Sequence, residues 1–347
     1  MHLLKCMAAA ACVSTLVASA ARAQATPRDT TPRQARENAR NVRMFMDRSN
    51  SEAERLRAAE AAEGLNGVDQ VTWAINLLRN PAELPRIRAA ALLKAQNAVA
   101  VDANLQREIA ELLGNRAEAP ALREASMATV ENLSFATPPS ALAGGAMDDT
   151  LRSLLDDPDA ALRLRAVTVL VNHHDEAARS RLVQGLQSPA EAAVAPADAV
   201  RLLGRDLQPD ALPALRQVMA SPPDQPTRIE AIRALGADLE SRAAIAAILA
   251  DRQEPEAVRL QAMASLNANA APQEFAAYTR PIVTDEAAGD ALRLYAILAE
   301  KDRRGDVAEL PEDEFDQAVR ALATSSTSQA VRDAAAEYLR SRRLAQT

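Results

Sequence analysis

Residues 224–236 read Asp-Gln-Pro-Thr-Arg-Ile-Glu-Ala-Ile-Arg-Ala-Leu-Gly. In this stretch Thr227 is followed directly by Arg228, then by Ala231 and Leu235 at the fourth and eighth positions after the threonine. Positions 0, 4 and 8 lie on one face of an α-helix. A residue as small as alanine at the middle position lets a neighbouring helix approach closely. The stretch therefore predicts a helix that packs tightly along one side.

The same nine-residue phrase recurs along the chain, usually with an apolar residue at its first position. Clear copies begin at Leu162, Thr227, Val258 and Val331, and looser copies begin at Glu54, Pro85, Leu122, Ala195 and Leu292. The copy at Ala195 has Pro196 in place of the arginine. The second positions of successive copies are 31 to 40 residues apart. A period of this length is typical of repeat proteins, in which each repeat is one small group of packed elements.

A second amphipathic stretch follows most copies of the phrase, and a proline-containing breaker follows that stretch. Residues 209–219 and 240–249 are examples of the second stretch, and Ser221-Pro222-Pro223 is an example of the breaker. Proline is tolerated best at a helix boundary. Each unit is therefore predicted to be helix, turn, helix and breaker. We expect an all-α fold, an α-solenoid of about nine helix-turn-helix repeats over residues 49–343.

The phrase resembles the HEAT-repeat family, and most closely its short bilin-lyase-type repeats. Their phrase is Asp-Pro-x-x-x-Val-Arg-x-x-Ala-x-x-Ala-Leu-Gly, and residues 157–170 match it nearly as well as residues 224–236. The resemblance covers about residues 50–343. Tetratricopeptide repeats, the alternative, share the period, but their tryptophan and tyrosine markers do not recur here. The likeness to bilin lyases lies in a packing phrase, so it implies a fold and not an activity.

An acidic residue stands shortly before several of the phrase arginines. These residues are Glu118, Asp159, Asp224, Glu256 and Asp290. In the HEAT family such pairs resemble a ladder that joins adjacent repeats, and the planar guanidinium suits a carboxylate at a packed junction. The resemblance therefore implies that these arginines support the fold and do not form an anion-binding stripe.

The N-terminal segment has the pattern of a secretory signal peptide. Lys5 precedes an apolar run that ends in Ala21-Arg22-Ala23. A positive start, a short apolar stretch and an exit of this type are typical of cleaved signals. We expect cleavage after Ala23, a periplasmic location with secretion as the second choice, and no membrane insertion of the mature protein. Both cysteines, Cys6 and Cys12, lie in residues 1–23, so the mature chain would have no disulfide.

The predicted signal peptide and the first repeat set the limits of the segments between them. Residues 24–32 are predicted to be a flexible leader and residues 33–48 an N-terminal capping helix. The composition fits helices, because the 347 residues include only 10 glycines and 2% aromatic residues. The net charge is −7, which does not suit binding to nucleic acid.

Two groups of residues resemble metal sites. His173 and His174 are the only histidines besides His2. Adjacent positions point about 100° apart on a helix, whereas helical metal ligands prefer a spacing of four. We therefore expect the pair to form a turn before the next helix. Residues 312–314 and Asp316 are acidic and follow Pro311, which predicts a helix start with favourable charge and not a calcium site.

Enzyme signatures are absent from the sequence. It contains no G-x-S-x-G, no H-E-x-x-H, no phosphate-binding loop and no dinucleotide fingerprint. We therefore expect no catalytic residue, no cofactor, no metal and no enzymatic activity. The predicted function is a scaffold or adaptor that binds a protein or an extended peptide along its concave face. The alternative is a lyase-like or metal-dependent enzyme, or an accessory to one, built on the same solenoid.

A candidate binding face follows from aligning two second helices at Ser188-Pro189 and Ser221-Pro222. This alignment places Leu182 opposite Leu215, where both are expected to be core residues. The expected partner-binding residues on the concave side are Arg181, Gln184, Arg216 and Gln217. The phrase also predicts that Ala231 packs against a neighbouring helix, while Glu230 lies on the exposed side.

Overall fold

The structure is a computed structural model that describes residues 31–65, 67–285, 287–304 and 314–344. Every regular element in these ranges is a helix, and no strand occurs among them. The predicted signal peptide and all but the last two residues of the predicted leader lie outside the described residues. The chain divides into two compact units, one ending at Ala178 and the other beginning at Arg179.

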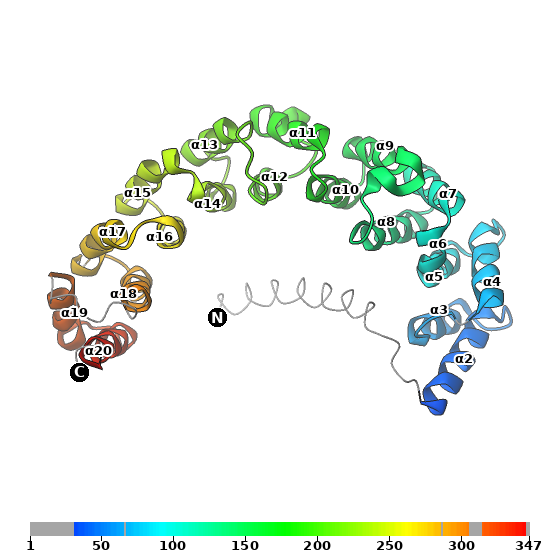
Figure 1. Cartoon of the computed structure of the whole chain (residues 1–347), viewed down its shortest axis with the longest axis horizontal. Coiled ribbons are helices and arrows are strands. Elements are labelled where there is room, and N and C mark those ends of the chain that lie inside the picture. The colour runs from blue at the N-terminus through cyan, green and yellow to red at the C-terminus, as the bar shows by residue number, and fades with distance from the viewer. Residues whose placement is uncertain (1–30, 66, 286, 305–313, 345–347) are drawn as a thin grey trace. The chain divides into compact units, whose positions relative to one another are not determined.

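The division between the units falls inside α11 (Glu176–Gln187). The first unit contains α2 (Pro32–Met46), α3 (Glu52–Ala61), α4 (Val68–Arg79), α5 (Pro85–Lys94), α6 (Gln96–Val101), α7 (Ala103–Gly114), α8 (Pro120–Ser134), α9 (Ala146–Ser153) and α10 (Ala160–Asn172). Two 3₁₀ segments, η2 (Pro139–Gly145) and η3 (Leu154–Asp156), flank α9. These elements are labelled in Figure 1.

The second unit is also built of successive helices. It contains α12 (Pro196–Leu203), α13 (Leu212–Ala220), α14 (Gln225–Ala234), α15 (Arg242–Ala250), α16 (Glu256–Asn269), α17 (Pro272–Thr284), α18 (Asp290–Arg304), α19 (Glu314–Ser325) and α20 (Gln329–Leu344). Short 3₁₀ segments η4 (Pro189–Glu191), η5 (Leu235–Ala237) and η6 (Leu239–Ser241) lie in the connections.

Each copy of the phrase lies on its own helix, and these helices stack on one another. The phrase helices are α3, α5, α8, α10, α12, α14, α16, α18 and α20. Successive members are in contact within each unit, from α3 to α10 and from α12 to α20. We call this series the phrase row. The prediction of an all-α solenoid is confirmed.

Of its two neighbours in the chain, a phrase helix packs mainly against the one before it. Such pairs include α4 with α5, α7 with α8, α13 with α14 and α15 with α16. The predicted breaker is therefore the turn inside a tight helix pair, and it does not separate one repeat from the next. We call the helices that precede the phrase helices in the second unit, including α13, α15 and α17, the opposite row.

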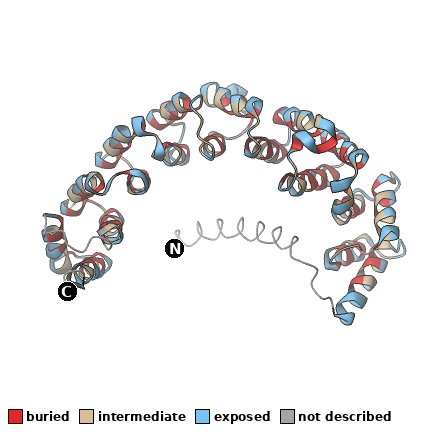
Figure 2. Cartoon of the chain, viewed as in Figure 1, coloured by how far each residue is buried: buried red, intermediate tan, exposed pale blue. Residues whose placement is uncertain are grey.

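The small residue at the middle of the phrase lies at the helix contacts, as predicted. Ala166, Ala231, Ala262, Ala296 and Ala335 all have 0% exposure. Leu182 and Leu215 are buried as well. Buried residues lie between the helices of each unit, and exposed residues cover their outward faces (Figure 2).

Two details of the predicted register are wrong. Glu230 is not on an exposed side, because its side chain is 14% exposed and is paired with Arg201 and Arg233. In the looser copy at Pro85, the buried residue is Ile87 and the phrase arginine is Arg88. The run of alanines from 89 to 91 fits both registers, and burial of Ile87 decides between them.

The arginine ladder exists, but its partners differ from the predicted ones. The Nε atoms of four phrase arginines donate to carbonyl oxygens at the end of the preceding helix. These bonds run from Arg55 to Phe45, Arg88 to Leu78, Arg123 to Leu113 and Arg259 to Leu249, with lengths of 2.8–3.0 Å. In these four cases the bond joins the phrase helix to its predecessor, since it satisfies a carbonyl that the helix end leaves open.

The carboxylate partners mostly come from the next repeat and not from the residues just upstream. Arg55 pairs with Glu83, Arg123 with Asp157 and Arg228 with Glu254, at 2.5–2.8 Å. Of the predicted upstream acids, Asp159 and Asp224 accept hydrogen bonds from backbone amides at the starts of their helices, and Glu118 pairs with Arg88. Only the pair of Arg293 with Asp290, at 2.7 Å, follows the prediction among the described contacts.

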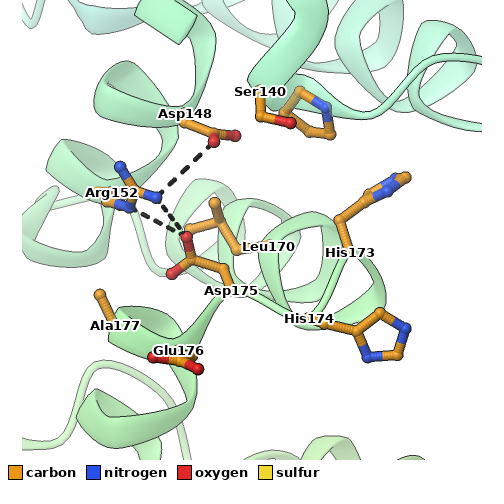
Figure 3. A pocket seen from close by; sticks show the side chains of 10 residues that line it. Ser140, Asp148, Arg152, Leu170, His173, His174, Asp175, Glu176 and Ala177 are labelled. Atoms are coloured by element: carbon orange, nitrogen blue, oxygen red, sulfur yellow. Dashed lines mark hydrogen bonds and ion pairs between the residues drawn. The ribbon is translucent and has the colours of Figure 1, made fainter.

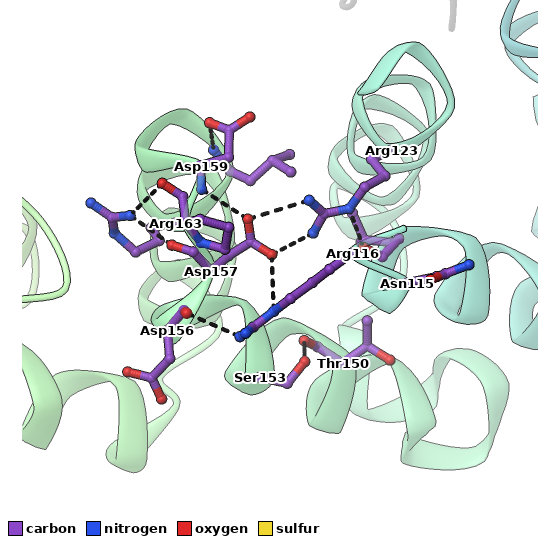
Figure 4. A network of polar contacts seen from close by, with 12 residues as sticks. Asn115, Arg116, Arg123, Thr150, Ser153, Asp156, Asp157, Asp159 and Arg163 are labelled. Carbon is purple, nitrogen blue, oxygen red and sulfur yellow. Dashed lines mark hydrogen bonds and ion pairs between the residues drawn. The ribbon is translucent and has the colours of Figure 1, made fainter. Parts of the chain in front are cut away.

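Asp157 is the centre of the most buried part of this ladder (Figure 4). Its carboxylate accepts two hydrogen bonds from Arg123, at 2.5 and 3.3 Å, and one from the backbone amide of Asp159 at 2.9 Å. Arg116 lies 3.8 Å away. The side chains of Arg123 and Asp157 are 7% and 1% exposed, so this network joins α7, α8 and α10 inside the first unit.

Candidate functional site

The four predicted partner-binding residues lie on α11 and α13. Gln184 and Gln217 are exposed, whereas Arg181 and Arg216 are half-buried. Arg216 forms ion pairs with Asp238 at 2.7 Å and Glu240 at 2.6 Å, so it holds the connection that leads to α15. The Gln184 amide donates to the Glu191 carboxylate. Arg216 therefore stabilises the fold through its ion pairs. Gln184 and Gln217 are exposed to solvent.

The location of this face differs from the expectation. Within the second unit, α14, α16 and α18 line the inner side of the curve, and α13, α15 and α17 line the outer side (Figure 1). Gln217, on α13, therefore lies in the opposite row and not on the concave side. The binding role of the four residues remains a prediction.

The phrase row of the second unit carries a chain of polar contacts between successive helices. Arg201 of α12 lies 3.6 Å from Glu230 of α14. Glu230 also pairs with Arg233 at 2.8 Å, and Arg233 donates to the side-chain oxygen of Gln261, on α16, at 3.5 Å. The Arg201 and Arg233 side chains are 47% and 55% exposed. We call Arg201, Glu230, Arg233 and Gln261 the polar ladder.

A cleft of about 480 Å³ opens in the first unit between η2, α9 and the turn from α10 to α11. Its walls include the carboxylates of Asp148, Asp175 and Glu176, the guanidinium of Arg152, and both histidines. Figure 3 shows Asp148 and Ser140 on one side, with the His173 ring across from them. This volume lies within the range of small-molecule binding sites.

Local backbone geometry shapes the cleft. The long connection at 138–149 folds into η2, where Ala143, Gly144 and Gly145 have positive φ angles and turn the chain into α9. His173 ends α10, and His174 has φ +60°, which turns the chain sharply toward α11. The predicted turn at the histidine pair is confirmed. Asp175 then accepts a hydrogen bond from the amide of Ala178 at 2.7 Å and so caps α11.

The acidic side chains in and beside the cleft differ in how closely they contact Arg152. Arg152 pairs with Asp175 at 2.6 Å, with Asp149 at 3.2 Å and with Asp148 at 3.7 Å. Burial raises the pKa of Asp148, and Asp175 and Asp149 raise it further, while Arg152 and His173 act in the opposite direction. Burial disfavours the charged form of a carboxyl group. The guanidinium is therefore shared among three acids, and its contact with Asp148 is the longest of the three.

No group of three or more histidine, cysteine, aspartate or glutamate side chains is arranged to hold a metal ion in the described part of the chain. Acidic residues 312 and 313 lie outside the described residues. Glu314 begins α19, and Asp316 is buried and accepts a hydrogen bond from the Tyr338 hydroxyl at 2.6 Å. Asp316 thus contributes to packing at the end of the second unit.

The phrase row, the arginine ladder and the tight helix pairs define a helical repeat protein. Residues 148–236 match the family model for HEAT repeats, and the predicted resemblance is confirmed. Such repeats form a helical scaffold. A search of curated proteins found no match. Among the described helices, none has the length and apolar character needed to cross a bilayer.

Among solved structures, the chain is similar to human deoxyhypusine hydroxylase in complex with glycerol. The sequence identity is 16%, the match covers 90% of this chain and 97% of the other, and the TM-score is 0.29. That protein is an enzyme. The prediction that the chain is not an enzyme is contradicted by this finding, and we drop it. At this level of similarity the comparison assigns no activity or ligand to the present chain.

Proposed function

We propose that this protein is a scaffold that binds an extended segment of a partner protein along the phrase row of its second unit. The polar ladder is the observation that supports this proposal. Helices packed side by side are about 8–10 Å apart, so equivalent side chains of successive helices repeat at a spacing that an extended chain can follow. The opposite row also has ion pairs between successive helices, such as Arg242 with Glu274, but the exposed face of α15 includes Ala243, Ala244 and Ala247, which offer no polar side chain.

The chemistry of the polar ladder favours a polar partner segment. Arg201 and Arg233 are about half exposed, and each also has a neighbouring acid, Asp198 for Arg201 and Glu230 for Arg233. Their charges are thus balanced locally, and the guanidinium groups retain donors that point to solvent. Such a surface recognises backbone carbonyls and polar side chains by hydrogen bonds and does not depend on a large net charge.

Removing the two ladder arginines is expected to weaken partner capture. The double variant Arg201→Gln, Arg233→Gln should recover about tenfold less of the partner from a periplasmic extract than the wild type, which corresponds to a loss of about 1.4 kcal/mol. The thermal midpoint should fall only modestly, because both arginines are about half exposed and such ion pairs contribute about 0–1 kcal/mol each.

The matched control is Gln184→Glu, Gln217→Glu, which alters the face predicted from the sequence. If this control loses the partner and the arginine variant retains it, the binding face is the opposite row. If both variants recover the same partner at the wild-type yield, neither face binds it.

We further propose that the scaffold acts in the periplasm. The supporting feature is the exit motif Ala21-Arg22-Ala23 after a short apolar run. The intact mass of protein isolated from the periplasm should correspond to a chain that starts at Gln24 and has no reactive thiol. Recovery of a chain that retains Cys12 would contradict both the cleavage site and this location.

A further inference from the structure

The cleft of the first unit carries an excess of negative charge. Asp148, Asp175 and Glu176 line it, and Arg152 is the one arginine in its walls. This guanidinium is engaged by Asp175 and Asp149, so it is not available to bind an anion. A ligand that complements the cleft is therefore a cation.

Asp148 is placed to accept hydrogen bonds from such a ligand. Its only polar contact among the described residues is the ion pair with Arg152 at 3.7 Å, which is longer than a hydrogen bond. Its side chain is 18% exposed. Ser140 and His173 flank the same space and supply two more polar groups, each with an atom that can accept a hydrogen bond (Figure 3).

The floor of the cleft suits the stem of a basic side chain. Ala177 is an exposed apolar residue beside the acids, and the buried residues Leu170 and Pro139 also line the cleft. The long methylene stems of lysine and arginine pack against apolar surface while their charged ends reach polar groups. Two helix ends at the cleft suit a cation, because α10 ends there with its negative pole and Asp175 neutralises the start of α11. Asp148 lies in the first turn of α9 and offsets the positive end of that helix.

We propose that this cleft binds the guanidinium or ammonium group of an arginine or lysine side chain from a partner protein, with Asp148 as the principal acceptor. The source of the side chain rests on the proposed scaffold function, whereas the chemistry of the cleft does not. The cleft would then fix one basic residue of a partner while the polar ladder of the second unit binds an extended segment.

The two histidines provide a direct readout. The mature protein has no histidine besides His173 and His174, so nitrogen-15 spectra of the imidazole groups report on the cleft alone. Titration with N-acetyl-arginine amide should shift the His173 signals in a saturable way at millimolar concentrations. N-acetyl-glutamine amide, which lacks the charge, should produce no saturable shift.

Asp148→Asn should weaken this binding at least about tenfold. The matched control is Asp149→Asn on the same helix, because the Asp149 side chain is 81% exposed and the residue does not line the cleft. The control should bind the probe as the wild type does. Equal shifts with both probes, no shift with either, or wild-type binding by Asp148→Asn would each overturn the proposal.

The result of the probe titration can be distinguished from the result of the partner-capture experiment. A saturable, Asp148-dependent shift supports the cation site even if no partner protein is captured. Conversely, capture that depends on Arg201 and Arg233, without any shift by the arginine probe, would leave the scaffold and remove the cation site.

Discussion

Replacing Asp157 by asparagine is expected to lower the free energy of unfolding of the first unit by about 3–5 kcal/mol, the cost of breaking a buried ion pair from one side. The variant keeps the shape of the side chain but removes the charge that Arg123 faces. Because Arg123 is 7% exposed, its guanidinium would remain buried without an acid. The backbone amide of Asp159, which donates to the Asp157 carboxylate, could still donate to the side-chain oxygen of the asparagine.

The sole tryptophan gives a measurement confined to the relevant unit. Trp73 lies in the first unit and packs edge-on against Phe45 with ring centres 5.3 Å apart. Urea unfolding followed by its fluorescence should show the full loss for Asp157→Asn. Asp149→Asn, which removes an exposed carboxylate that pairs with Arg152, should cost less than about 1 kcal/mol. Equal midpoints for the two variants would mean that the buried network contributes little.

The same network predicts a dependence on pH. Burial acts to raise the pKa of Asp157, but the hydrogen bonds from Arg123 and the Asp159 amide, with the charges of Arg123 and Arg116, outweigh it and hold the pKa below the ordinary 3.8. A lowered folded-state pKa gives stability that is present above the unfolded value and is lost as the pH falls through the folded one. The wild type and Asp157→Asn should therefore converge in stability as the pH falls below about 4.

Replacing Ala231 by leucine is expected to destabilise the second unit by about 1–3 kcal/mol through overpacking. Ala231 has 0% exposure on α14, which packs against α12, α13 and α16. The chain packs closely one turn away, because a Cβ atom added at Gly204, the residue after α12, would lie 2.7 Å from the Cβ of Ala234. The larger side chain must therefore push the helices apart or adopt a strained rotamer.

The matched control for this variant is Ala247→Leu in α15, since Ala247 is exposed in the same unit. Glu230→Leu is not suitable as a control, because it would break the pairs with Arg201 and Arg233. Thermal unfolding followed by circular dichroism should show a lower midpoint for Ala231→Leu and a nearly unchanged one for Ala247→Leu. Equal shifts would show that the helix register is wrong.

The sequence is sufficient to predict which residues of a single helix are buried. Spacing within the phrase identifies Ala231 and Ala262 as contact residues, because helical periodicity alone places them on one face. It does not identify Asp157 as the partner of Arg123, since that pair depends on how one repeat stacks on the next across 34 residues. The same limit explains why proximity in sequence favours Glu118, which pairs with Arg88 instead.

The cleft could not be predicted because it is formed by parts of three elements. In the sequence the long connection at 138–149 is only a departure from the repeat, whereas its fold into η2 and α9 brings Asp148 near the histidine pair. The available signal is the coincidence of this insertion with two adjacent histidines at the end of the next phrase helix. Neither feature alone indicates a cavity.

Site-specific photo-cross-linking in the native periplasm tests the central claim most directly. A photoreactive amino acid placed at position 233, in the polar ladder, should form a cross-link to one defined partner protein, whereas the same group at position 217, in the opposite row, should not. Both positions are exposed, so accessibility does not favour either. Cross-links at position 217 alone, or none at either position while the protein is correctly localised, would contradict a scaffold that binds through its phrase row.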